Sequence, residues 1–177
     1  MKFRDFVVRD AIITDLRASA KADAIREVVS SLADSGALPT PVADGVASAI
    51  LAREGIATTA LGRGVAFPHA RHAGVPGLVG TIAIDRKGLE YGALDEQKVD
   101  ILIAVVSPAA EAGRHLRVLE FLCAAVGGEP GGARGTARPR PEVFPGIHWL
   151  DKLREAKTRD EVVAVLDEVD RVFGTDR

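Results

Sequence analysis

The sequence predicts an α+β domain in which a mixed central β-sheet of four or five strands lies between helices in a three-layer α/β/α arrangement. Two stretches with helical periodicity come first, short β-like runs follow, and helical stretches return near the end. The chain has 177 residues, of which 47% are hydrophobic and 27% charged, the balance of an ordinary globular protein. We therefore expect a single domain over residues 1–177 with a real hydrophobic core.

Two helices are expected before the strands. The first ends at Gly36, and its apolar face recurs at helical spacing. The second begins at Thr40, an N-cap residue followed by proline, and ends at Gly55, so Arg53 lies in its last turn. The residues expected to be buried are Ile25, Val28, Val29 and Leu32 in the first helix, and Val42, Val46, Ala49 and Ile50 in the second.

Four short β-like runs are expected to form the sheet. Glycine and proline clusters separate them, and Pro108 ends the last one. The runs comprise residues 56–59, 64–67, 79–84 and 100–106.

The remainder of the chain is expected to be helical, with one interruption. A helix after Pro108 places His115 on its apolar face, and residues 127–147, rich in Gly, Pro and Arg, are expected to be a flexible surface insertion. Trp149 is expected to be buried at the start of a short helix, and a capping box at Thr158 starts the last one. The other apolar positions are Val118, Leu119, Leu122 and Val126, then Leu150 and Leu153, then Val163, Leu166, Val169 and Phe173.

Charge and composition exclude several classes of protein. The formal net charge is -2 with no basic block, which argues against nucleic-acid binding. The single cysteine, Cys123, cannot form an internal disulfide and fits a reducing compartment. The N-terminus lacks the continuous apolar stretch of a signal peptide, and the most apolar run, residues 101–106, is too short to span a membrane. We expect a cytoplasmic protein with no cofactor and no direct insertion into a membrane.

The most constrained stretch surrounds His69. Pro68 fixes its own backbone φ and holds the next residue on a stiff, non-helical backbone, while Gly62 and Gly64 permit tight turns. A histidine in that position is well placed for chemistry, yet position alone supports a plain loop histidine equally well. His72, three residues on, suggests a metal site with His115 as a third ligand, but Pro68 argues against the helix that this spacing needs.

A wider pattern resembles a known family. Its elements are Arg53-Glu54, then Gly62-x-Gly64-Val-Ala-x-Pro-His69, an Asp95 region, a buried strand, and His115-Leu116. Together they resemble type-2 enzyme IIA of the phosphoenolpyruvate-dependent phosphotransferase system, the mannitol/fructose/nitrogen-regulatory class. The resemblance covers residues 3–126 and 149–173. The insertion after residue 126 is not a regular family feature, and Phe67 stands where an aliphatic residue is usual.

The resemblance implies a mannitol-type enzyme IIA fold and a phosphocarrier function. It implies that His69 accepts a phosphoryl group on Nε2 from a histidine-containing phosphocarrier protein and passes it to a IIB domain or uses it to control a regulated target protein. It also implies that His115 hydrogen-bonds the phosphoryl group and that Arg53 stabilises its charge. No cofactor is implied.

Other interpretations of the same residues stay open. Without the resemblance, Arg53 is a helix-end arginine and His115 a satisfied histidine on an apolar helix face. Arg71 and Arg114 are interpreted as exposed, solvated side chains. The alternative functions are a binding module of the same fold that works without phosphorylation, and a metal-binding protein with histidine ligands.

Overall fold

The structure is a computed structural model that describes residues 1–127 and 148–173, so residues 128–147 of the expected insertion lie outside the described residues. The helices are the 3₁₀ turns η1 (Phe3–Asp5), η2 (Arg9–Ala11) and η3 (Thr40–Val42), and α1 (Lys21–Asp34), α2 (Ala43–Ile56), α3 (Ala112–Val126), α4 (His148–Glu155) and α5 (Arg159–Phe173). The strands are β1 (Ala60–Gly62), β2 (Val65–Ala66), β3 (His69–His72), β4 (Val79–Leu89) and β5 (Val99–Pro108). No helix in the described part of the chain has the length and the apolar run that a membrane crossing needs.

Strand β5 is the centre of the sheet. Strand β4 pairs antiparallel along one edge of it, while β2 and β3 pair parallel with successive parts of the other edge. Strand β1 then pairs antiparallel with β2. Across the described residues this makes a mixed sheet of five strands, as the sequence predicts.

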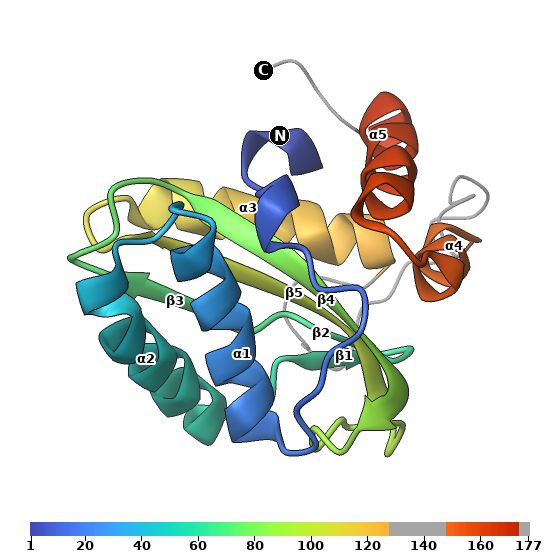
Figure 1. Ribbon diagram of the computed structural model, residues 1–177, viewed down its shortest axis with the longest axis horizontal. Coiled ribbons are helices and arrows are strands. Elements are labelled where there is room, and N and C mark those ends of the chain that lie inside the picture. Colours follow the sequence, from blue (N-terminus) through green and yellow to red (C-terminus); the bar gives the residue numbers. More distant parts are fainter. Residues whose placement is uncertain (128–147, 174–177) are drawn as a thin grey trace, which may run out of the picture.

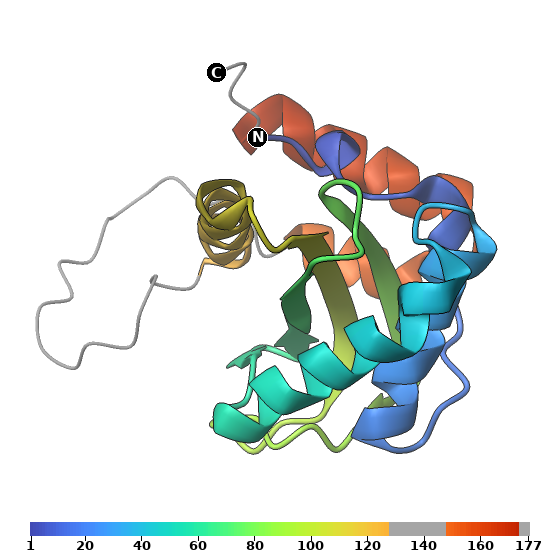
Figure 2. The same cartoon turned by 90° about the vertical axis from the view of Figure 1, so that its left-hand side faces the viewer.

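The side chains of β5 alternate between two cores, which defines the three layers. Ile101, Ile103 and Val105 pack into one core with α3, α4 and α5. Leu102, Ala104 and Val106 face the opposite side of the sheet, where α1 and α2 cover it. Figures 1 and 2 show α1 and α2 on one face of the sheet and the later helices on the other. Because β5 is covered on both faces, its sequence is apolar from Ile101 to Val106 rather than alternating.

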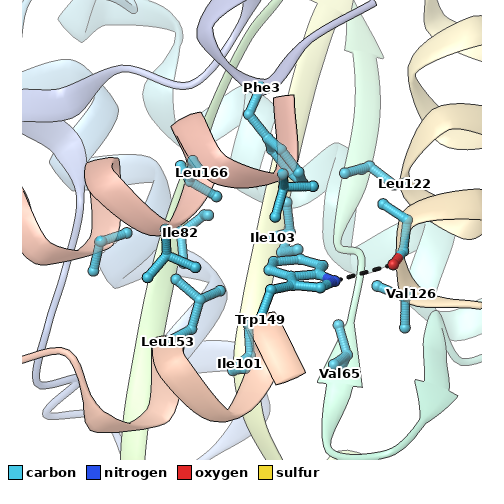
Figure 3. Close-up of a cluster of buried hydrophobic side chains, with 14 of the residues drawn as sticks. Phe3, Val65, Ile82, Ile101, Ile103, Leu122, Val126, Trp149, Leu153 and Leu166 are labelled. Atoms are coloured by element: carbon cyan, nitrogen blue, oxygen red, sulfur yellow. Dashed lines mark hydrogen bonds between the residues drawn. The ribbon is translucent and has the colours of Figure 1, made fainter. Parts of the chain in front are cut away.

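Trp149 fixes the start of the C-terminal helices to α3. Its side chain is 5% exposed, and its Nε1–H donates to the carbonyl of Ala125 at 3.1 Å (Figure 3). The predicted burial of this residue is therefore confirmed. Thr158 caps α5 as predicted, because its hydroxyl accepts the backbone N–H of Glu161. The Glu161 carboxylate accepts from the backbone N–H of Lys157, one residue before the partner that a capping box would use.

The N-terminal segment covers the free edge of β4. Backbone bonds join Phe6 and Val8 to Gly80, and Ile13 to Ile82. The carboxylate of Asp170 on α5 accepts the backbone N–H groups of Phe3 and Arg4, and Figure 2 shows this segment running along α5. The open edge of the sheet is thus paired with the protein's own chain.

Four local predictions are wrong. Residues 56–59 do not form a strand: α2 continues past Gly55 to Ile56, and β1 begins only at Ala60. The isoleucine side chain is 82% exposed, so no sheet burial reinforces its β propensity. Thr40 is not an N-cap but the first residue of the turn η3, with α2 beginning three residues later. Four expected core positions are only partly buried, although they pack against a core: Val42, Ala49, Leu119 and Val163. In α5 the neighbouring Val162 is fully buried instead. The fourth concerns β3, a strand that the sequence does not predict and that is described with the functional site.

Candidate functional site

A hollow of about 360 Å³ gathers the three residues that the sequence predicts for the site. It lies where α2 ends, where β3 begins and where α3 begins. Arg53 comes from α2, His69 from β3 and His115 from α3, and the remaining lining residues are Ala49, Ala70 and Arg71. The two alanines add little side-chain bulk to the hollow, where His69 is partly exposed and His115 is buried.

His69 is the first residue of β3, not a loop residue. Strand β3 pairs with β5 through His69 opposite Val105, and the carbonyl of Pro68 accepts the backbone N–H of the same valine at 3.0 Å. The sequence His-Ala-Arg-His has little β propensity, so nothing in its pattern predicts a strand. Its pairing with the buried β5 holds it in place.

The ring of His69 is oriented by its own backbone. Its Nδ1 lies 2.7 Å from the carbonyl oxygen of Phe67. A carbonyl oxygen only accepts, so Nδ1 must carry the hydrogen and donate it. In the neutral ring the lone pair is then on Nε2.

Burial keeps the ring of His69 neutral. Desolvation lowers the pKa of His69 below its ordinary value of 6.5, and the hydrogen bond to the Phe67 carbonyl is the largest effect that opposes it. The charges of Arg53 and Glu54 have smaller effects, the first lowering and the second raising the pKa. A neutral imidazole with a free Nε2 is a nucleophile. The local geometry therefore provides a nucleophilic nitrogen at neutral pH.

His115 lies beside His69, with ring centroids 5.4 Å apart. It is in the first turn of α3 and is 9% exposed. Its Nδ1 is 2.7 Å from the hydroxyl of Ser107, near the end of β5. Burial, followed by the charges of His69 and Arg71, lowers the pKa of His115 to about 4. Both imidazoles at the hollow are thus neutral near pH 7.

Arg53 brings a positive charge to the hollow from the last turn of α2. Its Nη1 donates to the carbonyl of Ala57 at 2.9 Å, directly after the helix. Through this bond Arg53 acts as a helix-end arginine, the alternative interpretation given for it above. The bond also holds the guanidinium in place. Within residues 1–127 and 148–173 the other guanidinium N–H groups have no hydrogen-bond partner, so they can bind oxygens of a ligand.

Two residues contribute to the site without having been predicted as site residues. Arg71 is exposed, as expected, but it lines the hollow, donates to the carbonyl of Ala109 at 3.2 Å and exerts its charge on His115. Arg114 matches the expectation of an exposed side chain and pairs with Glu111. Ser107 lies in no nucleophile motif, so no motif marks it as a site residue. The available signal was a hydroxyl residue at the end of an otherwise apolar run.

His72 is not brought to the hollow. The segment is a strand, so residues three apart point to opposite faces, and the predicted absence of a helix there is confirmed. Its Nδ1 accepts the backbone N–H of Gly74 at 3.1 Å. Among the described residues, no three His, Cys, Asp or Glu side chains gather closely enough to hold a metal ion.

The lowered pKa values predict how the two rings titrate. As pH falls, the ring resonances of His69 should titrate below 6.5, and those of His115 should stay in their neutral positions until about pH 4. Because the folded-state values are lowered, the unfolded chain binds protons first, so stability falls as pH drops from 6.5 toward about 4 and is unaffected by these groups above 6.5. NMR titration of the histidine ring protons checks this, and either ring titrating at or above 6.5 would contradict it.

Comparisons with known proteins agree on one family. The sequence profile described as "Phosphoenolpyruvate-dependent sugar phosphotransferase system, EIIA 2" matches residues 5–130. A nitrogen regulatory protein of Bradyrhizobium diazoefficiens is 29% identical over 119 residues, which cover 67% of this chain and 76% of the relative.

Solved structures share the fold. The nitrogen regulatory protein IIA-Ntr of Neisseria meningitidis superposes with a TM-score of 0.72 at 25% identity, covering 92% of this chain and 97% of the other. The complex of enzyme IIAMtl and phosphorylated enzyme IIBMtl from Escherichia coli matches with a TM-score of 0.65 at 20% identity, covering 90% and 95%. These matches confirm the expected enzyme IIA fold. Because the family profile spans most of the chain, including all three predicted site residues, this protein belongs to the EIIA 2 family of the phosphoenolpyruvate-dependent sugar phosphotransferase system.

Proposed function

We propose that the protein is a cytoplasmic phosphocarrier in which His69 is the phosphoryl acceptor. Its donor is the phosphohistidine of a histidine-containing phosphocarrier protein. The observation that carries the proposal is the bond from Nδ1 of His69 to the carbonyl of Phe67, because it leaves the Nε2 lone pair available in the hollow. A histidine held in one tautomer, in a site with an arginine and a second histidine, is suited to reversible phosphoryl transfer.

The proposed step exchanges one phosphorus–nitrogen bond for another. The Nε2 lone pair of His69 forms a bond to phosphorus as the bond to the donor's histidine nitrogen breaks, and the donor ring keeps that electron pair. Arg53 offsets the negative charge on the phosphoryl oxygens, and His115 donates a hydrogen bond to one of them. The product is a phosphoramidate, which keeps a high transfer potential, so the same geometry serves the onward transfer.

Two destinations for the phosphoryl group follow from the relatives. One solved structure holds a mannitol enzyme IIA together with phosphorylated IIB, and other relatives are nitrogen regulatory proteins. For this chain we therefore propose either transfer to a IIB domain or control of a target protein by the phosphorylation state of His69. The step itself uses no metal and no cofactor.

Phosphorylation with purified components tests the proposal. The protein is incubated with phosphoenolpyruvate and the general phosphotransferase components, and its intact mass is measured. We expect a gain of one phosphoryl group that is labile in acid and stable in base, as a phosphohistidine is. As a positive control, an enzyme IIA that accepts a phosphoryl group from the same donors shows that the donors are active. No mass gain under those conditions would refute the phosphocarrier function.

Arg53 is expected to accelerate the transfer. Replacing it with glutamine removes the cation while keeping a hydrogen-bonding side chain, and we expect single-turnover phosphorylation of His69 to slow by about 100-fold. Lysine at the same position should restore only part of the rate, because it lacks the planar fork. The matched control is Arg114→Gln, which removes an exposed arginine outside the hollow and should change the rate little. Equal rates for wild type and Arg53→Gln would contradict the assigned role.

A further inference from the structure

Ser107 is a buried polar residue that meets the hollow through its contact with His115. It lies near the end of β5, has no exposed surface, and is paired in the sheet with Arg71. Its neighbours along β5 are apolar residues that fill the two cores. A serine at that depth needs a hydrogen-bond partner, and its partner is Nδ1 of His115 at 2.7 Å.

The direction of that hydrogen bond follows from the available acceptors. A buried hydroxyl hydrogen must be donated to some acceptor. Within residues 1–127 and 148–173, the one partner found for the Ser107 hydroxyl is Nδ1 of His115. The hydroxyl therefore donates and Nδ1 accepts. A neutral ring that accepts at Nδ1 carries its own hydrogen at Nε2.

The two histidines are thus held in opposite tautomers by opposite kinds of partner. A carbonyl, which only accepts, fixes His69 with the hydrogen on Nδ1 and the lone pair on Nε2. The Ser107 hydroxyl, which donates, fixes His115 with the lone pair on Nδ1 and the hydrogen on Nε2. Nδ1 of His115 is taken by the buried serine, and the ring lines the hollow with its centroid 5.4 Å from that of His69, so the Nε2 edge is the one left to face the hollow.

We propose that Ser107 is a positioning residue that holds His115 in the Nε2–H tautomer, so that His115 donates a hydrogen bond to the phosphoryl group on His69. The inference rests on the proposed phosphocarrier function. Without the serine, Nδ1 of His115 has no donor, and the ring can exchange tautomers or turn. The tautomer with its hydrogen on Nδ1 would aim a lone pair at the phosphoryl oxygens and repel them.

The tautomer can be measured without any phosphoryl transfer. Long-range ¹H–¹⁵N correlation spectra of the unphosphorylated wild type at pH 7 distinguish protonated from unprotonated ring nitrogens. We expect His115 to show an unprotonated Nδ1 and a protonated Nε2, and His69 to show the reverse. A wild-type His115 with its hydrogen on Nδ1 would overturn the inference.

Variants at position 107 then connect the tautomer to the rate. For Ser107→Ala we expect the two nitrogen shifts of His115 to move toward each other, and phosphorylation of His69 to slow by roughly 10-fold. Ser107→Thr, which keeps a hydroxyl, should restore both, and Ser107→Cys, a weaker donor, should lie between. Thr81→Val is the matched control: it removes another buried hydroxyl of the sheet, which donates to the carbonyl of Ala11. It should leave the His115 tautomer and the rate unchanged.

The outcomes separate this inference from the function on which it rests. A slower Ser107→Ala with an unchanged His115 tautomer would show a structural loss and overturn the positioning role. A wild-type rate in that variant would overturn it as well. If the wild type itself takes up no phosphoryl group, the proposed function fails, and the spectra of the unphosphorylated protein still decide the tautomer.

Discussion

Replacing His69 with alanine is expected to abolish phosphoryl uptake completely. The substitution removes the one Nε2 lone pair that the hollow combines with Arg53 and His115. His115 cannot substitute, because we infer that its nitrogen facing the hollow carries a hydrogen and is a donor rather than a nucleophile. Intact mass after incubation with phosphoenolpyruvate and the donor proteins should show no gain for His69→Ala.

His72→Ala is the matched control for that experiment. It removes a histidine from the same strand whose side chain lies outside the hollow, and it should be phosphorylated like the wild type. A persistent mass gain in His69→Ala, or its loss in His72→Ala, would contradict the assignment. In the wild type, NMR of the phosphorylated protein should place the phosphorus on Nε2 of His69, because Nδ1 is committed to the carbonyl of Phe67.

Periodic and strongly apolar segments could be predicted from the sequence. Helix α1 follows its pattern closely, and the run around Ile101 is buried on both faces as the centre of the sheet. Strands β2 and β3 have two and four residues and carry too little pattern to show that they share one edge of β5. Short strands depend on the partner that they meet, which local sequence does not specify.

The site, like the fold, has features that could be predicted from the sequence and features that could not. The order of Arg53, His69 and His115 could be identified through the family pattern, and the position of Arg53 in a last helical turn followed from the helix end alone. The resemblance implies Nε2 as the reacting nitrogen of His69, but the contacts that orient the two rings, with the Phe67 carbonyl and the Ser107 hydroxyl, could not be predicted because only the folded chain creates them. The place of Arg71 in the hollow likewise depends on the register of β3 against β5.

Glu54, the acidic residue that follows Arg53 in the family pattern, has a structural role in a buried ion pair. Its side chain is only 3% exposed and accepts Nζ of Lys21 at 2.6 Å. It also accepts the backbone N–H and the hydroxyl of Thr59. Lys21 in turn donates to the carbonyl of Tyr91 at 3.1 Å and lies over the ring of that tyrosine. One carboxylate therefore joins the start of α1, the end of α2 and the approach to β1.

Glu54→Ala is expected to lower the free energy of unfolding by about 3–5 kcal/mol, since it removes one partner of a buried pair and leaves the other unpaired. The value should lie toward the lower end, because Lys21 is 26% exposed and can recover some hydration. Denaturant unfolding followed by circular dichroism measures it. Glu90→Ala breaks an exposed ion pair with Lys98 and should cause no measurable change. Equal stability of Glu54→Ala and wild type would contradict the account.

Neutralising both partners tests whether the loss comes from an uncompensated charge. Lys21→Met combined with Glu54→Gln removes both charges, while the glutamine oxygen can still accept from Thr59. We expect the double variant to be more stable than Glu54→Gln alone, because no buried charge then lacks its partner. Since Glu54 holds the last turn of α2, Glu54→Gln alone should also slow phosphorylation of His69 by displacing Arg53. Arg53→Gln should slow the reaction without comparable destabilisation, so the two measurements together separate Arg53, which we propose contacts the phosphoryl group, from Glu54, which holds Arg53 in place.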